Sequence, residues 1–173
     1  MRIENNLEVA HIGKLNNGSP LKPKVYPSDG NLLEKPWGEN LLWTSPLNAK
    51  YSWTNFLLTD YKIWLTNHKE YSLWKLDINP GKIAKVSSLN EYLNLINDFR
   101  DETNLAYIDW FKLSNNFDGF WLILDGLYES SNELEYNDYH RHFIHWDCES
   151  VVIFNTDIIT SMTKLPQTLQ LVI

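Results

Sequence analysis

The strongest structural signal in this sequence is the run Ser150–Phe154, whose β-branched and aromatic residues predict a buried strand. Tyr71–Ile78 alternates apolar with polar residues, which is typical of a half-buried strand. Further short strands are predicted at Leu7–Ile12, Glu39–Thr44, Lys82–Val86 and Phe120–Leu124. These strands outnumber the helices and do not alternate with them regularly. The pattern therefore predicts a mixed α+β fold and not a doubly wound one.

The clearest helix is predicted to begin at Ser88, because Ser88 and Glu91 have the spacing of a capping box. An apolar stripe follows at Tyr92, Leu95, Ile96 and Phe99. A short helix is predicted at Ile108–Leu113, and Pro46 predicts the start of another that runs to about Leu58. One more short element is expected between residues 158 and 173.

Length and composition limit the classes of protein to consider. The chain has 173 residues without repeats or an evident linker, so residues 1–173 are expected to form one domain. The net charge of −7 argues against a strongly basic nucleic-acid binder. No apolar run is long enough for a membrane span, and the first nine residues hold no apolar signal core. The simplest inference is a cytoplasmic protein that does not bind a membrane.

Several signatures of enzymes are missing, namely a phosphate-binding loop, a dinucleotide-binding GxGxxG, a GxSxG elbow, and the metal motifs CxxC and HExxH. The only cysteine, Cys148, lies between Asp147 and Glu149, whose charges raise the pKa of a thiol and argue against a nucleophile. Three nearby histidines are of the type that binds zinc: His140, His142 and His145. Their spacing matches no zinc pattern, which favours a structural role or contact with an acceptor over a metal site.

Three segments far apart in the chain carry the remaining candidate chemistry. Residues 10–14 place a histidine at a strand end, residues 39–53 place aromatic and hydroxyl side chains after a strand, and residues 146–155 place a glutamate at the mouth of a buried strand. Each has a plainer explanation when taken alone: a hydrogen-bonded structural histidine, a core tryptophan, and a solvated glutamate.

In this order, the three segments resemble the ADP-ribosyltransferase superfamily. The resemblance is closest to its His–Tyr–Glu branch, which includes the poly(ADP-ribose) polymerases and diphtheria-type toxins, and to small bacterial and phage proteins. The matching residues are His11 and Gly13 on the first strand, Trp43, Thr44 and Ser45 on the second, Tyr51, Ser52 and Trp53 after it, and Glu149 at the start of a late strand. Trp43 stands where the branch usually has tyrosine. The pattern lacks the first-strand arginine of the arginine-modifying branch, so arginine is disfavoured as acceptor.

The resemblance implies two small mixed or antiparallel sheets that flank an NAD cleft, with the ends of the three strands converging. It assigns the catalytic role to Glu149, an acceptor-side role to Asp147, and no role to a metal. It assigns NAD binding to His11, Gly13, Trp43, Thr44, Ser45, Tyr51 and Trp53. These roles suit the chemistry, because an indole stacks on the cationic nicotinamide and a fixed carboxylate stabilises the charge that develops on the ribose.

The resemblance thus implies a mono-ADP-ribosyltransferase that uses NAD as substrate and modifies a macromolecule, either protein or nucleic acid. A chain of this size suits a toxin or a phage-encoded modifier, for which an antitoxin or inhibitor would be the partner. Two alternatives stay open. One is an NAD glycohydrolase with the same fold, and the other is a non-catalytic binding or inhibitor module with a Trp-rich surface.

Overall fold

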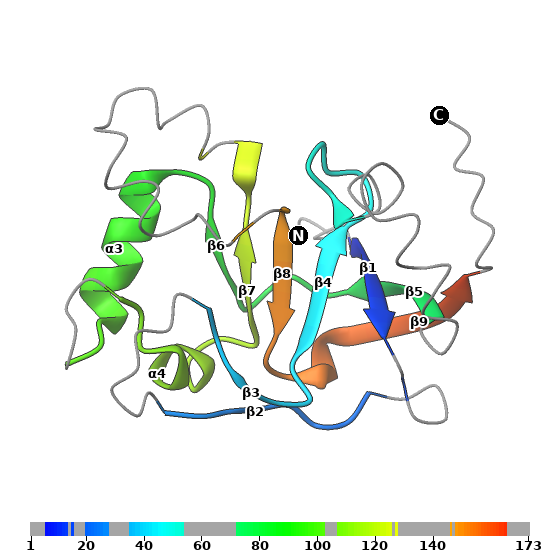
Figure 1. Ribbon diagram of the computed structural model, residues 1–173, viewed down its shortest axis with the longest axis horizontal. Helices are drawn as coiled ribbons and strands as arrows, with labels where there is room; N and C mark the ends of the chain where they lie inside the picture. The colour runs from blue at the N-terminus through cyan, green and yellow to red at the C-terminus, as the bar shows by residue number, and fades with distance from the viewer. Residues whose placement is uncertain are drawn as a thin grey trace.

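The computed structural model describes residues 6–13, 15, 20–27, 35–53, 72–102, 107–125, 127, 146 and 148–165. A seven-stranded sheet dominates this part of the chain (Figure 1). The strands across it are β6 (Ile83–Val86), β7 (Gly119–Leu122), β8 (Ser150–Ile153), β4 (Leu42–Pro46), β1 (Leu7–Gly13), β5 (Ser72–Ile78) and β9 (Ile159–Leu165). Neighbours are antiparallel except β6 and β7, which are parallel. The predicted mixed α+β fold is confirmed.

The division into sheets differs from the expectation. The expected two small sheets are joined into one, and β4 connects its two halves. The β1–β4 connection is narrow, because only the pairs Val9–Pro46 and Ala10–Ser45 are in register. Strands β1 and β5, in contrast, are paired from Leu7 to Gly13. The second sheet is only the ribbon of β2 (Lys24–Val25) and β3 (Gly38–Glu39).

Apolar side chains cover both faces of the sheet. Successive side chains of a strand point to opposite faces, and the buried residues form two clusters accordingly. The helix-face cluster joins Phe120 and Val152 to the helices α3 (Leu89–Phe99) and α4 (Trp110–Ser114). The opposite-face cluster includes Leu42, Val151 and Ile153. Burial on both sides explains why β8 is apolar from Val151 to Ile153 and gave such a strong signal.

Helix α3 begins where the sequence predicted. The Ser88 hydroxyl accepts the N–H of Glu91 at 3.3 Å, which caps the helix. The Glu91 carboxylate accepts the backbone N–H of Ser87 at 2.7 Å and its hydroxyl at 2.8 Å, so the returning bond goes to the residue before the cap. Tyr92 and Ile96 are buried in the helix-face cluster, as their spacing predicted.

The prediction that a helix starts at Pro46 is wrong. Pro46 is the last residue of β4 and lies opposite Val9, and the N–H of Leu47 still donates to the carbonyl of Glu8 at 3.1 Å. The segment that follows turns, with the N–H of Ser52 donating to the carbonyl of Ala49 at 3.2 Å. The rest of that predicted helix, residues 54–58, lies outside the described residues.

The strand predicted at Glu39–Thr44 is also divided, into the end of β3 and most of β4. Asn40 lies between the two with a φ of 56°, in the left-handed region that asparagine tolerates better than most residues. Such a residue cannot continue a strand, so the chain changes direction there and enters the large sheet.

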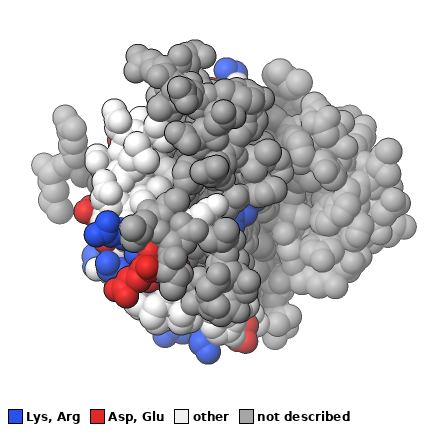
Figure 2. All heavy atoms as spheres, turned by 60° about the vertical axis from the view of Figure 1, so that its left-hand side comes forward, with Lys and Arg blue, Asp and Glu red and all other residues white. Residues whose placement is uncertain are grey.

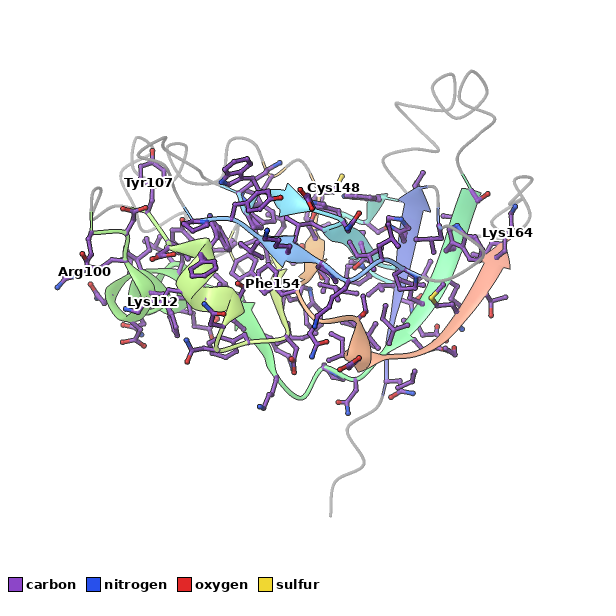
Figure 3. The ribbon with its side chains drawn as sticks, turned by 90° about the horizontal axis from the view of Figure 1, so that it is seen from below. Arg100, Tyr107, Lys112, Cys148, Phe154 and Lys164 are labelled. Atoms are coloured by element: carbon purple, nitrogen blue, oxygen red, sulfur yellow. The ribbon has the colours of Figure 1, made fainter. Side chains whose placement is uncertain are left out.

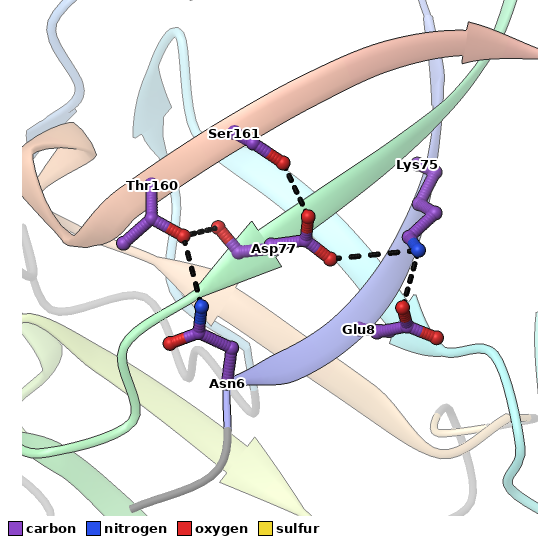
Figure 4. Close-up of polar contacts among 6 residues, drawn as sticks. All are labelled: Asn6, Glu8, Lys75, Asp77, Thr160 and Ser161. Carbon is purple, nitrogen blue, oxygen red and sulfur yellow. Dashed lines mark hydrogen bonds and ion pairs between the residues drawn. The ribbon is translucent and has the colours of Figure 1, made fainter.

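A polar cluster links β1, β5 and β9 at the other half of the sheet (Figure 4). The Lys75 ammonium binds the carboxylate of Glu8 and lies 3.7 Å from that of Asp77. The Ser161 hydroxyl donates to the carboxylate of Asp77, and the Thr160 hydroxyl donates to its backbone carbonyl. Cross-strand pairs of this kind favour one register, and they fix β1, the strand that carries His11.

None of the helices among the described residues is long and apolar enough to span a bilayer.

Candidate active site

The three strands that carry the candidate residues are consecutive neighbours in the sheet, in the order β8, β4, β1. His11 lies on β1, Ser45 on β4, and Glu149 directly before β8. The chain therefore brings together segments from its beginning and its end.

The backbone of Glu149 is held by β4 and by the segment that follows it. Its N–H donates to the carbonyl of Tyr51 at 2.9 Å, and its carbonyl accepts the Ser45 hydroxyl at 2.6 Å. The same hydroxyl accepts the N–H of Trp53 at 2.9 Å. Ser45 is fully buried. Three residues predicted to bind NAD thus have a structural function in common, which is to position Glu149.

Replacing Ser45 with Ala is expected to lower the free energy of unfolding by about 1–3 kcal/mol, because the N–H of Trp53 and the carbonyl of Glu149 lose their partner in a buried place. Urea unfolding measures this effect. The matched control is Ser150→Ala, since the Ser150 hydroxyl is also buried and, within the described part of the chain, donates to the nearby carbonyl of Cys148 alone. An Ser45→Ala protein as stable as wild type would show that Ser45 does not hold the site together.

The carboxylate of Glu149 is buried and fixed by Trp121. The indole Nε1–H of Trp121 donates to Oε1 of Glu149 at 3.0 Å. Glu149 is only 5% exposed. Burial raises the pKa of Glu149 above its usual value, the bond from Trp121 partly offsets this, and the negative charge of Asp125 raises it further.

A pocket of about 440 Å³ opens beside this carboxylate. Its lining combines a tryptophan with two glutamates, two asparagines and three apolar residues. These residues are Asn6, Leu7, Glu8, Pro46, Asn48, Ala49, Trp121 and Glu149. A few polar groups that converge in a pocket of this volume are what small-molecule sites have in common, so the pocket is a candidate binding site.

His11 is 9% exposed and has one defined tautomer. Its Nδ1 lies 2.8 Å from the carbonyl oxygen of Trp43, so Nδ1 carries the proton and Nε2 of the neutral ring is an acceptor. Burial lowers the pKa of His11, while the bond to the carbonyl partly opposes this, so the ring is neutral at neutral pH. A Cβ on Gly13 would lie 2.5 Å from Nε2. Because Gly13 has no side chain, the imidazole of His11 has room at this position.

Trp43 lies apart from the Glu149 carboxylate. Its ring packs against the helix-face cluster and contacts Trp146, with ring centroids 5.6 Å apart. The Lys35 ammonium lies 5.8 Å from the centroid of Trp43 and 5.3 Å from that of Trp146. Thr44, the next residue, donates its hydroxyl to the carbonyl of Val151 at 2.8 Å. The Trp43 ring therefore contributes to packing, and the Thr44 hydroxyl bonds to the neighbouring strand.

Sequence reasoning missed Trp121. The sequence predicted its strand, but the indole reaches Glu149 only because β7 pairs with β8, and no local pattern shows this pairing.

Asp147 and the three histidines at 140, 142 and 145 lie outside the described residues. Cys148, labelled in Figure 3, is buried and precedes Glu149 in the chain. Among the described residues, no three side chains of His, Cys, Asp or Glu are grouped as a metal ion would require. Comparisons with protein-family models, curated proteins and solved structures find no significant match to this chain.

Proposed function

We propose that this protein cleaves the nicotinamide–ribose bond of NAD and transfers the ADP-ribose to a macromolecule, on an ADP-ribosyltransferase-like fold. The observation that carries the proposal is the Glu149 carboxylate, buried and oriented by Trp121 at the rim of a pocket. The adjacency of β8, β4 and β1 supports the same assignment, because the motif residues of this family resemblance lie on those strands or in the segments next to them.

Glu149 would act by charge. When the bond between the ribose C1′ and the nicotinamide nitrogen breaks, its electron pair leaves with nicotinamide and positive charge develops on the ribose. A fixed carboxylate stabilises that charge most in the transition state. The acceptor then supplies an electron pair to C1′ and loses a proton to solvent. The neutral His11 ring, with Nε2 as acceptor, suits a hydroxyl donor on the substrate.

The direct test is release of nicotinamide from NAD by the purified protein. Incubation of labelled NAD with a cell lysate, followed by nuclease or protease digestion, then identifies the acceptor as nucleic acid or protein. Figure 2 shows acidic and basic side chains next to one another on the described part of the side that bears α3 and α4, so this surface does not favour either acceptor. Release without labelling of any macromolecule indicates a glycohydrolase. A protein that neither binds nor cleaves NAD is a non-catalytic module, and the proposal fails.

Turnover is expected to fall on the acid side at a higher pH than for an ordinary glutamate, whose pKa lies near 4.5. The reason is that the pKa of Glu149 is raised, so the carboxylate takes up a proton and loses its charge earlier as the pH falls. The pH profile of turnover measures this. Asp125→Asn removes a negative charge that raises the pKa of Glu149, and should move the acid limb to lower pH. An acid limb that stays in place in Asp125→Asn would argue against titration of Glu149.

A further inference from the structure

The two faces of the sheet separate the aromatic residues near Glu149. Trp43, Val152 and Phe120 lie opposite one another in register on β4, β8 and β7, and they belong to the helix-face cluster. The adjacent row is Thr44, Val151 and Trp121. Side chains of one row share a face and those of adjacent rows point to opposite faces. Trp121 therefore lies on the face opposite to Trp43, and the Glu149 carboxylate lies with Trp121.

The surroundings of the Trp43 and Trp121 rings also differ, in agreement with their positions on opposite faces. The Trp43 ring contacts Trp146 and packs against the helix-face cluster, with the Lys35 ammonium over both rings. Trp121, in contrast, lines the pocket beside Glu149. The ammonium of the exposed Lys85 lies 5.7 Å from the Trp121 centroid, so this ring already has a cation–π contact. A substrate cation can take the place of this ammonium, which then returns to solvent.

The pocket also has the polar groups that one half of NAD needs. Asn48 offers a carboxamide, which can both donate to and accept from the amide of nicotinamide. The Nδ2 of Asn6 donates to the hydroxyl of Thr160 at 3.4 Å, so its carboxamide keeps the oxygen as an acceptor. Glu149 offers a carboxylate for ribose hydroxyls and for the positive ring, whereas the carboxylate of Glu8 is bound by Lys75. Its volume of about 440 Å³ lies in the lower part of the range for small-molecule sites, which suits part of a dinucleotide better than the whole.

Resting on the proposed function, we infer that the nicotinamide riboside half of NAD binds in this pocket, with Trp121 and not Trp43 as its aromatic contact. Trp121 then has two roles in the site. Its ring contacts the substrate, and its Nε1–H holds the carboxylate of Glu149 in place. The adenosine half lies outside this pocket.

The test compares nicotinamide mononucleotide and adenosine monophosphate, the two halves of NAD, as separate ligands in calorimetric titrations. Trp121→Leu should weaken the binding of nicotinamide mononucleotide about 5- to 30-fold, the loss typical of a cation–π contact, and change that of adenosine monophosphate less than twofold. Trp121→Phe keeps an aromatic ring and provides a milder change if the Leu variant does not fold. Trp43→Phe is the matched variant on the other face, and it should weaken the binding of nicotinamide mononucleotide less than Trp121→Phe does. Melting curves show that each variant is folded.

The outcomes separate the inference from the proposed function. A wild-type protein that binds NAD but loses mononucleotide affinity as much in Trp43→Phe as in Trp121→Phe, or more, overturns the inference and leaves the proposed function standing. Equal weakening of both half-ligands by Trp121→Phe also overturns the inference, because the effect then extends beyond one half. A wild-type protein that binds neither NAD nor the mononucleotide overturns both.

Discussion

Glu149→Gln is expected to lower NAD turnover by about 10²–10³-fold, the usual effect of removing one well-placed electrostatic group. Glutamine keeps the shape of the side chain and an oxygen that can accept the Trp121 Nε1–H. Only the charge is lost, so the effect should fall on turnover and little on the binding of NAD. The measurement is nicotinamide release at saturating NAD by the variant and the wild type.

Stability shows whether such a loss comes from chemistry or from misfolding. Because the folded-state pKa of Glu149 is raised, its contribution to stability is greatest when it is protonated and is lost as the pH rises through that pKa. At neutral pH, Glu149→Gln should therefore unfold at the same temperature as wild type or at a higher one. Glu91→Gln is the matched control, since Glu91 caps α3 outside the candidate site and should keep full turnover. Wild-type turnover in a folded Glu149→Gln protein would remove Glu149 from the mechanism.

The elements of the fold were largely predictable because their signals are local. The apolar run of β8, the alternation in β5 and the cap at Ser88 each reflect the surroundings of a few consecutive residues. Pro46 was misread because proline is common both at helix starts and at strand ends, and the pairing with Val9 decides between these. That pairing joins residues far apart in the chain, which no local pattern contains.

The sequence proposed the residues of the candidate site, while their geometry depends on the sheet. Order along the chain identified His11, Ser45 and Glu149, and the sheet does place their strands side by side. The face on which each side chain lies depends on register, since a shift of one residue moves a side chain to the other face. Register separates Trp43 from the carboxylate of Glu149 and brings Trp121 to it. Sequence alone favoured Trp43 because it lies within the motif.

Phe120→Ala is expected to lower the free energy of unfolding by about 3–5 kcal/mol, the typical loss for a large aromatic side chain in a core. Phe120 is fully buried on β7, with its ring centroid 5.1 Å from that of Trp110 and 5.7 Å from that of Trp146. It joins α4 to the sheet, and the residue that follows it, Trp121, holds Glu149. Since small domains are stabilised by only about 5–15 kcal/mol in total, this change should remove a large part of the stability.

Phe111→Ala is the matched control, because it makes the same chemical change on α4 at a residue that is 41% exposed. It leaves no buried cavity, so its effect should be well below that of Phe120→Ala. Urea unfolding followed by tryptophan fluorescence measures both. The position of Trp121 makes the comparison informative about function too, since a cavity at Phe120 that loosens β7 should lower NAD turnover before the protein unfolds. Equal loss of stability in the two variants would show that the helix-face cluster is not the core that joins α4 to β7.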